Sequence, residues 1–522
     1  MMSFFTHMNL RKSCTSCPFS RIPRQGDITI GDFWGIKQTN RYFADDKGVS
    51  LLLINNEKGK KLFDAVKENF SVVEQKSLEN AYNENPNLIS SSVPNPNSDR
   101  FFEMIQSYSV NSTYHDLIFD RVDVLIMNYW RYLNVGAMMT AYALQHTLNQ
   151  LGFTNKLISY CHKKELNSAY EKSPFKRFEQ KYLRTTAIMQ KQQLKSLNNK
   201  ANNFIVGSDQ IWNSVINSGD MAFFLDFVNP DKRKIACSAS LGSVGFSSDI
   251  ITFELEKHYI HQFDAISVRE DESKAILENT FNIASDHILD PVFALTKDDY
   301  ITLANDSSMS LPERYIAIYS ILPLDTISKE IDYLKSRYKA PLVNININNS
   351  SLDLVDWINA IQNCELLVTD SFHGLCFALI FNKPFICVNM NNSSVRLLSL
   401  CRTFGISDHL WCVGEDISNE FLHAPIDYQT INNIMSIERK KIRKWLKTSL
   451  TADKKLSFDH KGYLINHLID KINEHSAFIQ GIQNREFTKQ ILKYKLLYKF
   501  TFGKKRKHYK NRYKELKNKL QG

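Results

Sequence analysis

Residues 365–388 constrain the fold most, because apolar segments alternate there with short polar turns. Leu366 to Val368 form a short apolar run, which is followed by Thr369-Asp370-Ser371. Residues 375–381 are almost wholly apolar, and Asn382-Lys383-Pro384 separates them from a second apolar run at 385–388. The pattern predicts a buried strand, a helix that begins near Ser371, and a second strand. This is the repeating unit of a parallel α/β sheet.

His373 lies at the polar turn of this unit. In open parallel sheets, ligands bind beyond the carboxyl ends of the strands, near helix N-termini whose free N–H groups attract anions. A lone histidine more often caps a helix or completes a core. Here the neighbouring Thr369, Asp370, Ser371 and Gly374 favour a functional site. We therefore expect His373 to face a ligand.

The same alternation occurs twice along the chain. Apolar strand candidates in the first set are residues 122–127, 157–158, 204–206, 235–239 and 265–268. Those in the second set are residues 315–319, 342–347, 366–368 and 385–388. The two sets predict an α/β protein with two facing Rossmann-like (GT-B-like) halves and a central cleft. The first set has no G-x-G-x-x-G motif, so a nicotinamide cofactor is not supported.

Composition shifts suggest the domain limits. A polar, proline-containing segment at 91–99 reads as a linker, and residues 160–200 as a polar, helical insertion. We expect a small α+β segment over residues 1–95, with strands near 28–30 and 50–54 and a helix over 57–75. The two halves are expected over 120–305 and 306–447, with a basic helical tail over 448–522.

Charge is concentrated in that tail. Residues 489–522 contain thirteen lysines and arginines and one acid, a net +12, so the rest of the chain carries −2 of the total of +10. Aromatic residues are interleaved with these cations, which predicts peripheral contact with an anionic membrane. Nucleic acid is not expected as a partner, because the remaining chain has no excess of basic residues. A solvated basic extension is the alternative.

The rest of the composition is typical of a globular protein, with 43% hydrophobic and 23% charged residues. We find no apolar run long enough to cross a membrane and no secretory signal pattern. The nine cysteines are scattered, several of them in apolar segments, which is typical of a reducing compartment. We therefore expect a cytoplasmic protein, held through its tail at the inner face of the membrane.

Ordered motifs over residues 122–445 resemble the polysaccharide pyruvyl transferase family. The matching motifs are Asn134-Val135-Gly136-Ala137, Gly207-Ser208-Asp209-Gln210-Ile211-Trp212-Asn213, Ser267-Val268-Arg269-Glu270, Asp290-Pro291-Val292 and Thr369-Asp370-Ser371-Phe372-His373-Gly374. The resemblance implies transfer of a pyruvyl group from phosphoenolpyruvate to sugar hydroxyls, as a ketal, with release of phosphate. It also implies a bacterial enzyme of surface polysaccharide synthesis, such as exopolysaccharide or capsule, with a glycan acceptor that can be lipid-linked and no cofactor.

The resemblance also implies roles for individual residues. His373 would be the general acid or a contact to the phosphate, and Arg269 would bind the donor substrate. The implied substrate-binding set is Asn134, Gly136, Ser208, Asp209, Arg269, Asp370, Ser371, Gly374 and Arg396. Family members with established chemistry have arginine where this chain has Ser371, and serine cannot replace that charge. Arg396 or Arg402 would then supply the cation, or the substrate differs.

The first residues show a second resemblance. Cys14-Thr15-Ser16-Cys17, residues 26–36 and residues 47–55 resemble the C-terminal region of the beta subunit of deazaflavin-reducing (coenzyme F420) hydrogenases and dehydrogenases. Two cysteines are an incomplete set of ligands for an iron–sulfur cluster or another metal. We expect Cys14 and Cys17 to be a remnant of such a site.

Three other functions remain open from the sequence. A glycosyltransferase-like enzyme would bind a nucleotide sugar in the same cleft, with Asp209 or Asp370 on the ribose or a metal. A redox accessory protein would depend on Cys14 and Cys17. A non-catalytic scaffold would explain Ser371, because fold alone does not establish activity.

Overall fold

The computed structural model describes residues 7–454 except 41–47, 83–84, 94, 162–163, 244, 324–325, 327, 348–351, 390–393 and 414–423. Beyond residue 454 it describes residues 490, 508 and 510–515. Residues 1–452 form one unit by their internal contacts, and residues 453–522 form another. Most of the predicted tail, with the predicted membrane contact, therefore lies outside the described residues.

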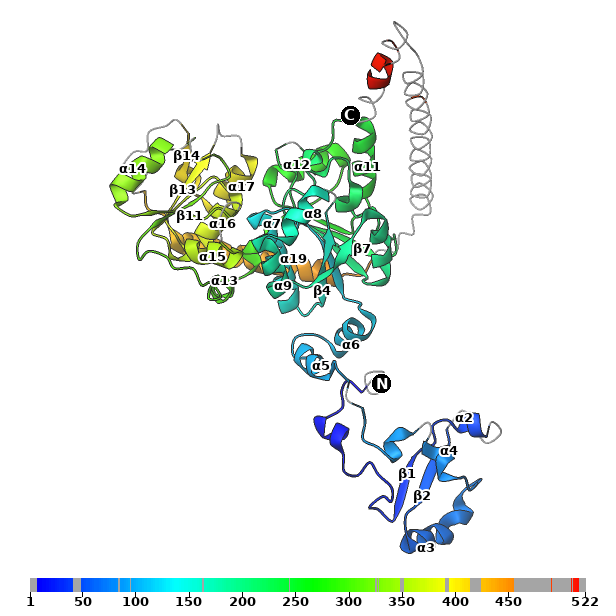
Figure 1. The fold of residues 1–522 in the computed structure, drawn as a ribbon. Helices are drawn as coiled ribbons and strands as arrows, with labels where there is room; N and C mark the ends of the chain where they lie inside the picture. Colours follow the sequence, from blue (N-terminus) through cyan, green and yellow to red (C-terminus); the bar gives the residue numbers. More distant parts are fainter. Residues whose placement is uncertain are drawn as a thin grey trace. The chain divides into compact units, whose positions relative to one another are not determined.

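The first α/β half is built on a seven-stranded, all-parallel sheet (Figure 1). The spatial order of its strands is β5-β4-β3-β6-β7-β8-β9. The strands are β3 (Val124–Met127), β4 (Asn155–Tyr160), β5 (Thr185–Met189), β6 (Asn203–Val206), β7 (Arg233–Ala239), β8 (Ala265–Val268) and β9 (Asp286–His287). Because the order reverses beside β3, this sheet has the switch point at which parallel sheets bind ligands.

The second half is built on a five-stranded parallel sheet in the order β11-β10-β12-β13-β14. Its strands are β10 (Ile316–Tyr319), β11 (Leu342–Asn344), β12 (Leu366–Thr369), β13 (Phe385–Asn389) and β14 (Leu410–Cys412). The prediction of two parallel α/β halves is therefore confirmed.

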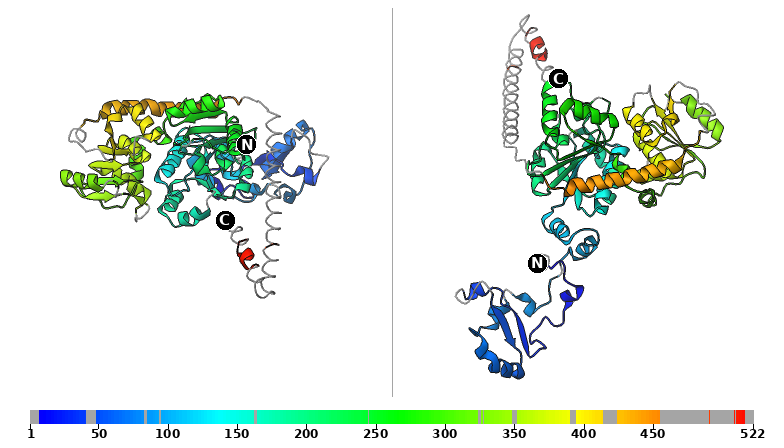
Figure 2. Two further views of the ribbon diagram at one scale, coloured as in Figure 1. Left: turned by 90° about the horizontal axis from the view of Figure 1, so that it is seen from above. Right: turned by 180° about the vertical axis from the view of Figure 1, so that it is seen from behind.

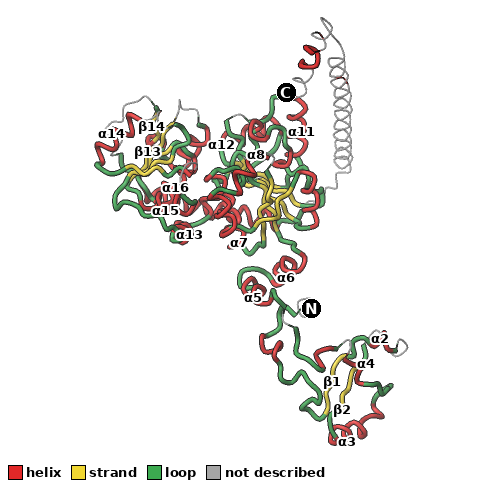
Figure 3. The backbone as a smooth tube through the Cα atoms, in the orientation of Figure 1, coloured by secondary structure: helices red, strands yellow, loops and turns green. Residues whose placement is uncertain are grey.

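Helices flank the strands in both halves (Figure 3). Those of the first half are α7 (Val135–Gln150), α8 (Lys164–Glu171), α9 (Pro174–Tyr182), α10 (Ser214–Asn217), α11 (Ile250–Ile260) and α12 (Asp271–Phe281). Those that follow are α13 (Lys297–Ala304), α14 (Ser328–Tyr338), α15 (Leu354–Asn363), α16 (Phe372–Phe381), α17 (Val395–Phe404) and α19 (Tyr428–Thr451). A short 3-10 helix, η6 (Pro291–Ala294), lies between β9 and α13.

Alternate residues of the strands enter different cores. In β3, Val124 and Ile126 belong to one apolar cluster, and Leu125 and Met127 to another. Both faces of the sheet are therefore covered, which explains why the strand is apolar at every position. The first cluster also contains Leu367 of β12, so one apolar core joins the two halves.

Helix α19 runs along both halves (Figure 2). At its start the Tyr428 hydroxyl donates a hydrogen bond to the Lys383 carbonyl of the second half. Near its end, the Trp445 indole N–H donates to Asp286 at 2.8 Å, and Arg233 donates to the Ser449 carbonyl at 2.8 Å. The helix therefore ties the second half to strands β7 and β9 of the seven-stranded sheet.

The N-terminal residues form a small two-stranded sheet with short helices. Strands β1 (Ile28–Asp32) and β2 (Ser50–Ile54) pair antiparallel. The helices are α2 (Ile36–Thr39), α3 (Glu57–Val66), α4 (Leu78–Tyr82), α5 (Ser98–Met104) and α6 (Val110–Phe119). In the described part of the chain, no helix is both long and apolar enough to span a membrane.

Two sequence predictions of secondary structure were wrong. Residues 160–200 are not only a helical insertion, because β5 lies within them and pairs with β4 at the edge of the main sheet. The predicted helix over 57–75 ends as α3 at Val66, followed by a short 3-10 helix, η2 (Lys67–Asn69). An edge strand is partly exposed, so its residues do not need the unbroken apolar pattern of a central strand.

Gly207 lets β6 and β7 lie close together at the end of the sheet. Its φ is +116°, and a Cβ atom there would lie 2.1 Å from the Cys237 carbonyl oxygen. We expect Gly207→Ala to lower the free energy of unfolding by about 3 kcal/mol, from the steric clash added to backbone strain.

The matched control is Gly405→Ala. Gly405 also has a positive φ, of +68°, but a Cβ atom there would meet nothing within 4 Å. Backbone strain alone should cost about 1 kcal/mol. Urea unfolding of both variants separates the two effects, and equal losses would contradict the predicted clash.

Candidate functional site

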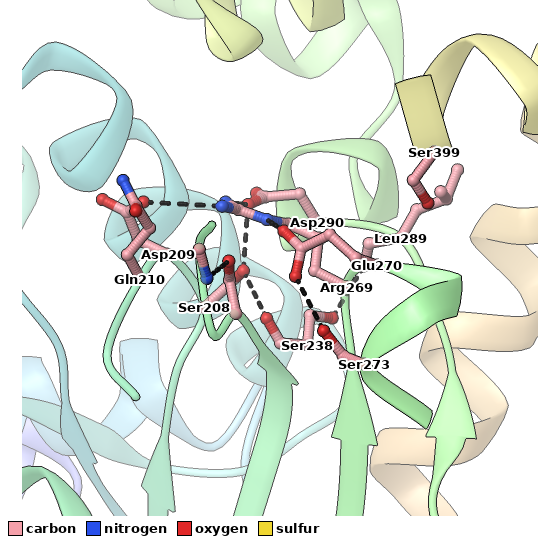
Figure 4. Close-up of polar contacts among 12 residues, drawn as sticks. Ser208, Asp209, Gln210, Ser238, Arg269, Glu270, Ser273, Leu289, Asp290 and Ser399 are labelled. Atoms are coloured by element: carbon pink, nitrogen blue, oxygen red, sulfur yellow. Dashed lines mark hydrogen bonds and ion pairs between the residues drawn. The ribbon is translucent and has the colours of Figure 1, made fainter. Parts of the chain in front are cut away.

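Polar side chains gather where strands β6 and β8 end (Figure 4). Ser208 and Asp209 follow β6, and Arg269 follows β8. All three residues are buried. The Asp209 carboxylate lies 3.7 Å from Nη2 of Arg269. The structure thus brings together three residues that the sequence predicts to bind substrate.

The carboxylate of Asp290 is the centre of this cluster, and its side chain is fully buried. Its Oδ2 lies 3.0 Å from the Ser208 hydroxyl and 3.0 Å from Nη1 of Arg269. Its Oδ1 accepts hydrogen bonds from the Thr140 hydroxyl at 3.0 Å and from the Val292 N–H at 3.1 Å. Both oxygens of this buried carboxylate are therefore satisfied.

Asp290 is ionised in the folded protein. Burial by itself would raise the pKa of this carboxyl group. Hydrogen bonding to His373, together with the charges of His373 and Arg269, holds the pKa of Asp290 well below its usual range instead. The cluster therefore contains a permanent negative charge that its neighbours must balance.

His373 is in the first turn of α16 and is only 5% exposed. Its Nε2 lies 3.0 Å from the Thr140 hydroxyl and 3.5 Å from Oδ2 of Asp290. Because the Thr140 hydroxyl donates its hydrogen to Asp290, its oxygen can accept a hydrogen bond from an N–H group at Nε2. In the described part of the chain, Nδ1 has no hydrogen-bond partner. Nε2 therefore anchors the ring.

Gly136 leaves room for the His373 ring, because it has no side chain. Gly136 belongs to α7, and a Cβ atom there would lie 1.9 Å from Nδ1 of His373. A side chain at this position would displace the imidazole. Gly136 thus has a steric role in packing α7 against α16, and its predicted contact with substrate stays a prediction.

The guanidinium group of Arg269 connects the two halves. Its Nε donates to Glu270 at 3.0 Å, and the group lies 4.3 Å from the ring centre of Phe372 in α16. Burial would lower the pKa of Arg269, but Glu270 and Asp290 raise it above its ordinary value. Nη2 is buried and has no hydrogen-bond partner among the described residues. This nitrogen can therefore donate to a ligand.

Arg396 and Arg402, both in α17, have different environments. Arg402 is already paired, because it forms ion pairs with Asp271 and Glu272. Arg396 is partly buried and has no ion pair or hydrogen bond with any residue that the structure describes. Burial, and then the charge of Arg269, lower the pKa of Arg396. Arg396 is thus a cation close to Arg269 that, unlike Arg269, has no ion pair among the described residues.

Three other predicted residues have structural roles within the protein. The Asn134 side chain caps α7 by accepting from the Ala137 N–H at 3.0 Å. Asp370 accepts hydrogen bonds from the backbone N–H groups of residues 321 and 322, both at 2.7 Å, and from the Ser320 hydroxyl. A Cβ atom on Gly374 would lie 2.1 Å from Oγ1 of Thr369. These contacts give each of the three residues a role in the fold. Their binding of substrate stays a prediction.

Sequence reasoning missed two residues of the cluster. Asp290 belongs to one of the matching motifs, but the sequence predicted no role for it. Thr140 gave no signal, because a threonine on an apolar helix usually packs in the core. Its hydroxyl instead links Asp290 to His373.

No group of three or more potential metal ligands occurs among the residues that the structure describes. Cys14 and Cys17 are free thiols, and both are partly buried. Their interpretation as a remnant stays a prediction.

Comparison with family models gives two matches. Residues 134–392 match the polysaccharide pyruvyl transferase family. Residues 5–79 match the family that comprises the C terminus of the coenzyme F420 hydrogenase/dehydrogenase beta subunit. Both resemblances suggested by the sequence are therefore confirmed. No curated protein matches the chain.

Several solved structures resemble the chain weakly. A UDP-N-acetylglucosamine 2-epimerase from Rickettsia bellii is 11% identical, with a TM-score of 0.38, and the match covers 64% of this chain and 98% of the epimerase. The ADP-heptose LPS heptosyltransferase II of E. coli is 12% identical, with a TM-score of 0.29, covering 61% of this chain and 99% of that one. Similarity at this level says nothing about activity.

Asp290 should stabilise the fold through its charge. Replacing it with asparagine leaves the buried Arg269 with a poorer partner, so we expect Asp290→Asn to cost about 3 kcal/mol at pH 7. The folded-state pKa is depressed, so this contribution is complete above the unfolded value near pH 4 and is lost as the pH falls below it. Urea unfolding at pH 7 and pH 3.5 should show the difference from wild type shrinking in acid.

Asp231→Asn is the control, because Asp231 is exposed and its one ion pair within the described residues, to Lys232, lies at the surface. It should change stability little at either pH. A deficit of Asp290→Asn that stays the same from pH 7 to pH 3.5 would show that shape, and not charge, explains the effect.

Proposed function

We propose that this chain, which contains a domain of the polysaccharide pyruvyl transferase family, transfers a pyruvyl group from phosphoenolpyruvate to sugar hydroxyls. The product would be a ketal in a polysaccharide, and phosphate would leave. The single observation that carries the proposal is that two neighbouring cations, Arg269 and Arg396, have hydrogen-bond donors without partners among the described residues, and that Arg269 shares Asp290 with the anchored His373.

Phosphoenolpyruvate carries a carboxylate and a phosphate, so its site needs cations and oriented N–H groups. Nη2 of Arg269 and the guanidinium group of Arg396 are suited to these two anions. Arg396 would supply the charge that arginine supplies in other family members at the position of Ser371. Arg402 is unsuited to this role because Asp271 and Glu272 already bind it.

The reaction also needs a proton at the methylene carbon of phosphoenolpyruvate as a hydroxyl attacks the central carbon. His373 is our candidate for the acid. Asp290 and Thr140 hold Nε2, in the way that a buried carboxylate orients a catalytic imidazole. Nδ1 is then the nitrogen that would transfer the proton.

The proposal is tested by incubating the full chain with phosphoenolpyruvate and a panel of glycans. Phosphate release should depend on the glycan, and mass analysis should find a product that has gained pyruvate less one water. Nucleotide sugars form the comparison arm. Transfer of a sugar from one of them, without turnover of phosphoenolpyruvate, would overturn the proposal.

Arg396→Gln should raise the KM for phosphoenolpyruvate about tenfold or more, because one charged hydrogen bond to the substrate is lost. The matched control is Arg402→Gln on the same helix, for which that KM should stay near the wild-type value. An equal effect of both variants would mean that α17 as a whole, and not Arg396, matters.

His373→Ala should reduce turnover about 100-fold or more, as expected when a general acid is removed. His261, which ends α11, provides the control, and His261→Ala should retain activity. Thermal unfolding of each variant checks that it is folded. Turnover of folded His373→Ala near the wild-type rate would exclude the acid role.

A further inference from the structure

Tyr319 is a residue of this cluster that no motif identifies. It ends strand β10 and pairs in register with Thr369, the last residue of β12. It is 8% exposed, and its ring packs edge-on against Trp357 at 5.1 Å between ring centres. Its side chain is therefore fixed at the carboxyl end of the second sheet, directly beside the turn that begins α16.

Tyr319 lies beside Thr369, which is two residues before the serine that precedes α16. The Ser371 side chain is its hydrogen-bonding neighbour, and it has no other such partner in the described part of the chain. Burial, and then the charges of Asp370 and Asp209, raise the pKa of Tyr319, so the phenol stays neutral. Asp209 of the first half is linked to the same turn through Arg269, which lies 3.7 Å from the Asp209 carboxylate and 4.3 Å from the ring centre of Phe372, the residue after Ser371.

Other buried tyrosines provide a contrast. The hydroxyl of Tyr315, just before β10, donates to the Ala360 carbonyl at 2.7 Å. That of Tyr300 donates to the Val292 carbonyl at 2.9 Å. Each of these hydroxyls is bound to the backbone, as is expected in a core. The Tyr319 hydroxyl makes no hydrogen bond to the backbone among the described residues, which leaves hydrogen-bonding capacity for a ligand.

Asp209 has unused capacity too. Its carboxylate makes no hydrogen bond within the described residues, and its one ion pair there, to Arg269, is long at 3.7 Å. Two neutral hydroxyls can both donate and accept, and a carboxylate accepts strongly. This combination suits a neutral polyol, whose hydroxyls also donate and accept, and suits an anion poorly.

We propose that Tyr319, Ser371 and Asp209 form the subsite for two neighbouring hydroxyls of the acceptor sugar. The inference rests on the proposed function and divides its site into two parts. Arg269 and Arg396 bind phosphoenolpyruvate. Ser371 would then help to bind the acceptor. Arg396 of α17 would supply the positive charge that an arginine at position 371 supplies in other family members.

The test measures the KM of each substrate separately. Tyr319→Phe removes only the hydroxyl and should raise the KM for the glycan about tenfold, with the KM for phosphoenolpyruvate within about twofold of wild type. Tyr315→Phe is the matched control, because its hydroxyl binds backbone next to the same strand, and it should leave both constants unchanged. A larger effect of Tyr319→Phe on phosphoenolpyruvate than on the glycan would overturn the assignment.

A second variant adds a charged side chain at position 371, whereas Tyr319→Phe removes a hydroxyl. Ser371→Arg introduces a cation into the acceptor subsite, so it should raise the KM for the glycan and leave that for phosphoenolpyruvate unimproved. A lower KM for phosphoenolpyruvate in this variant would assign position 371 to the donor side and contradict the inference.

Binding of the glycan alone separates this inference from the proposed function. Thermal-shift titration of the full chain with the glycan should show stabilisation that Tyr319→Phe weakens and Tyr315→Phe retains. If phosphoenolpyruvate is never consumed but this difference is found, the proposed function fails and the sugar subsite stands. If phosphoenolpyruvate is consumed and the two variants bind glycan equally, the subsite fails and the function stands.

Discussion

The buried charge of Asp290 is the interaction on which the rest of the site depends. A carboxylate with no exposure is tolerated only when it is paired and hydrogen-bonded on both oxygens. Satisfying it requires Ser208 from the end of β6, Arg269 from the end of β8, Thr140 from α7 and His373 from α16. Three of these elements belong to the first half and one to the second. The contacts that satisfy the Asp290 carboxylate therefore hold the two halves together at the proposed active site.

The sequence predicts the fold well wherever strands are central. Strands such as β3 and β12 are buried at every position, so they stand out as unbroken apolar runs. The sequence predicts less at the edges. Strand β5 is partly exposed along its length, and β9 has only two residues, so neither needs a recognisable pattern. The ends of elements are poorly predicted for the same reason. The helix predicted over 57–75, for example, ends at Val66.

The site was only partly predictable, because sequence cannot distinguish a satisfied polar group from a free one. Ser208, Arg269 and His373 follow strands in recognisable motifs, and the structure brings them together around Asp290. Asp370 lies in the same motif as His373, but backbone N–H groups occupy its carboxylate. Tyr319 had no signal, since its position at the end of an apolar strand is that of any core aromatic.

Charge balance constrains the proposed donor site. The cluster contains the carboxylates of three acidic residues within reach of Arg269, and the cations that oppose them in this cluster are Arg269 and Arg396. Three carboxylates against two guanidinium groups are an unfavourable balance for an anionic substrate. Binding of phosphoenolpyruvate in this cluster would therefore depend on both arginines together, because neither guanidinium group alone offsets the carboxylates. The proposed donor site thus needs Arg396 from α17 in addition to Arg269 from the end of β8.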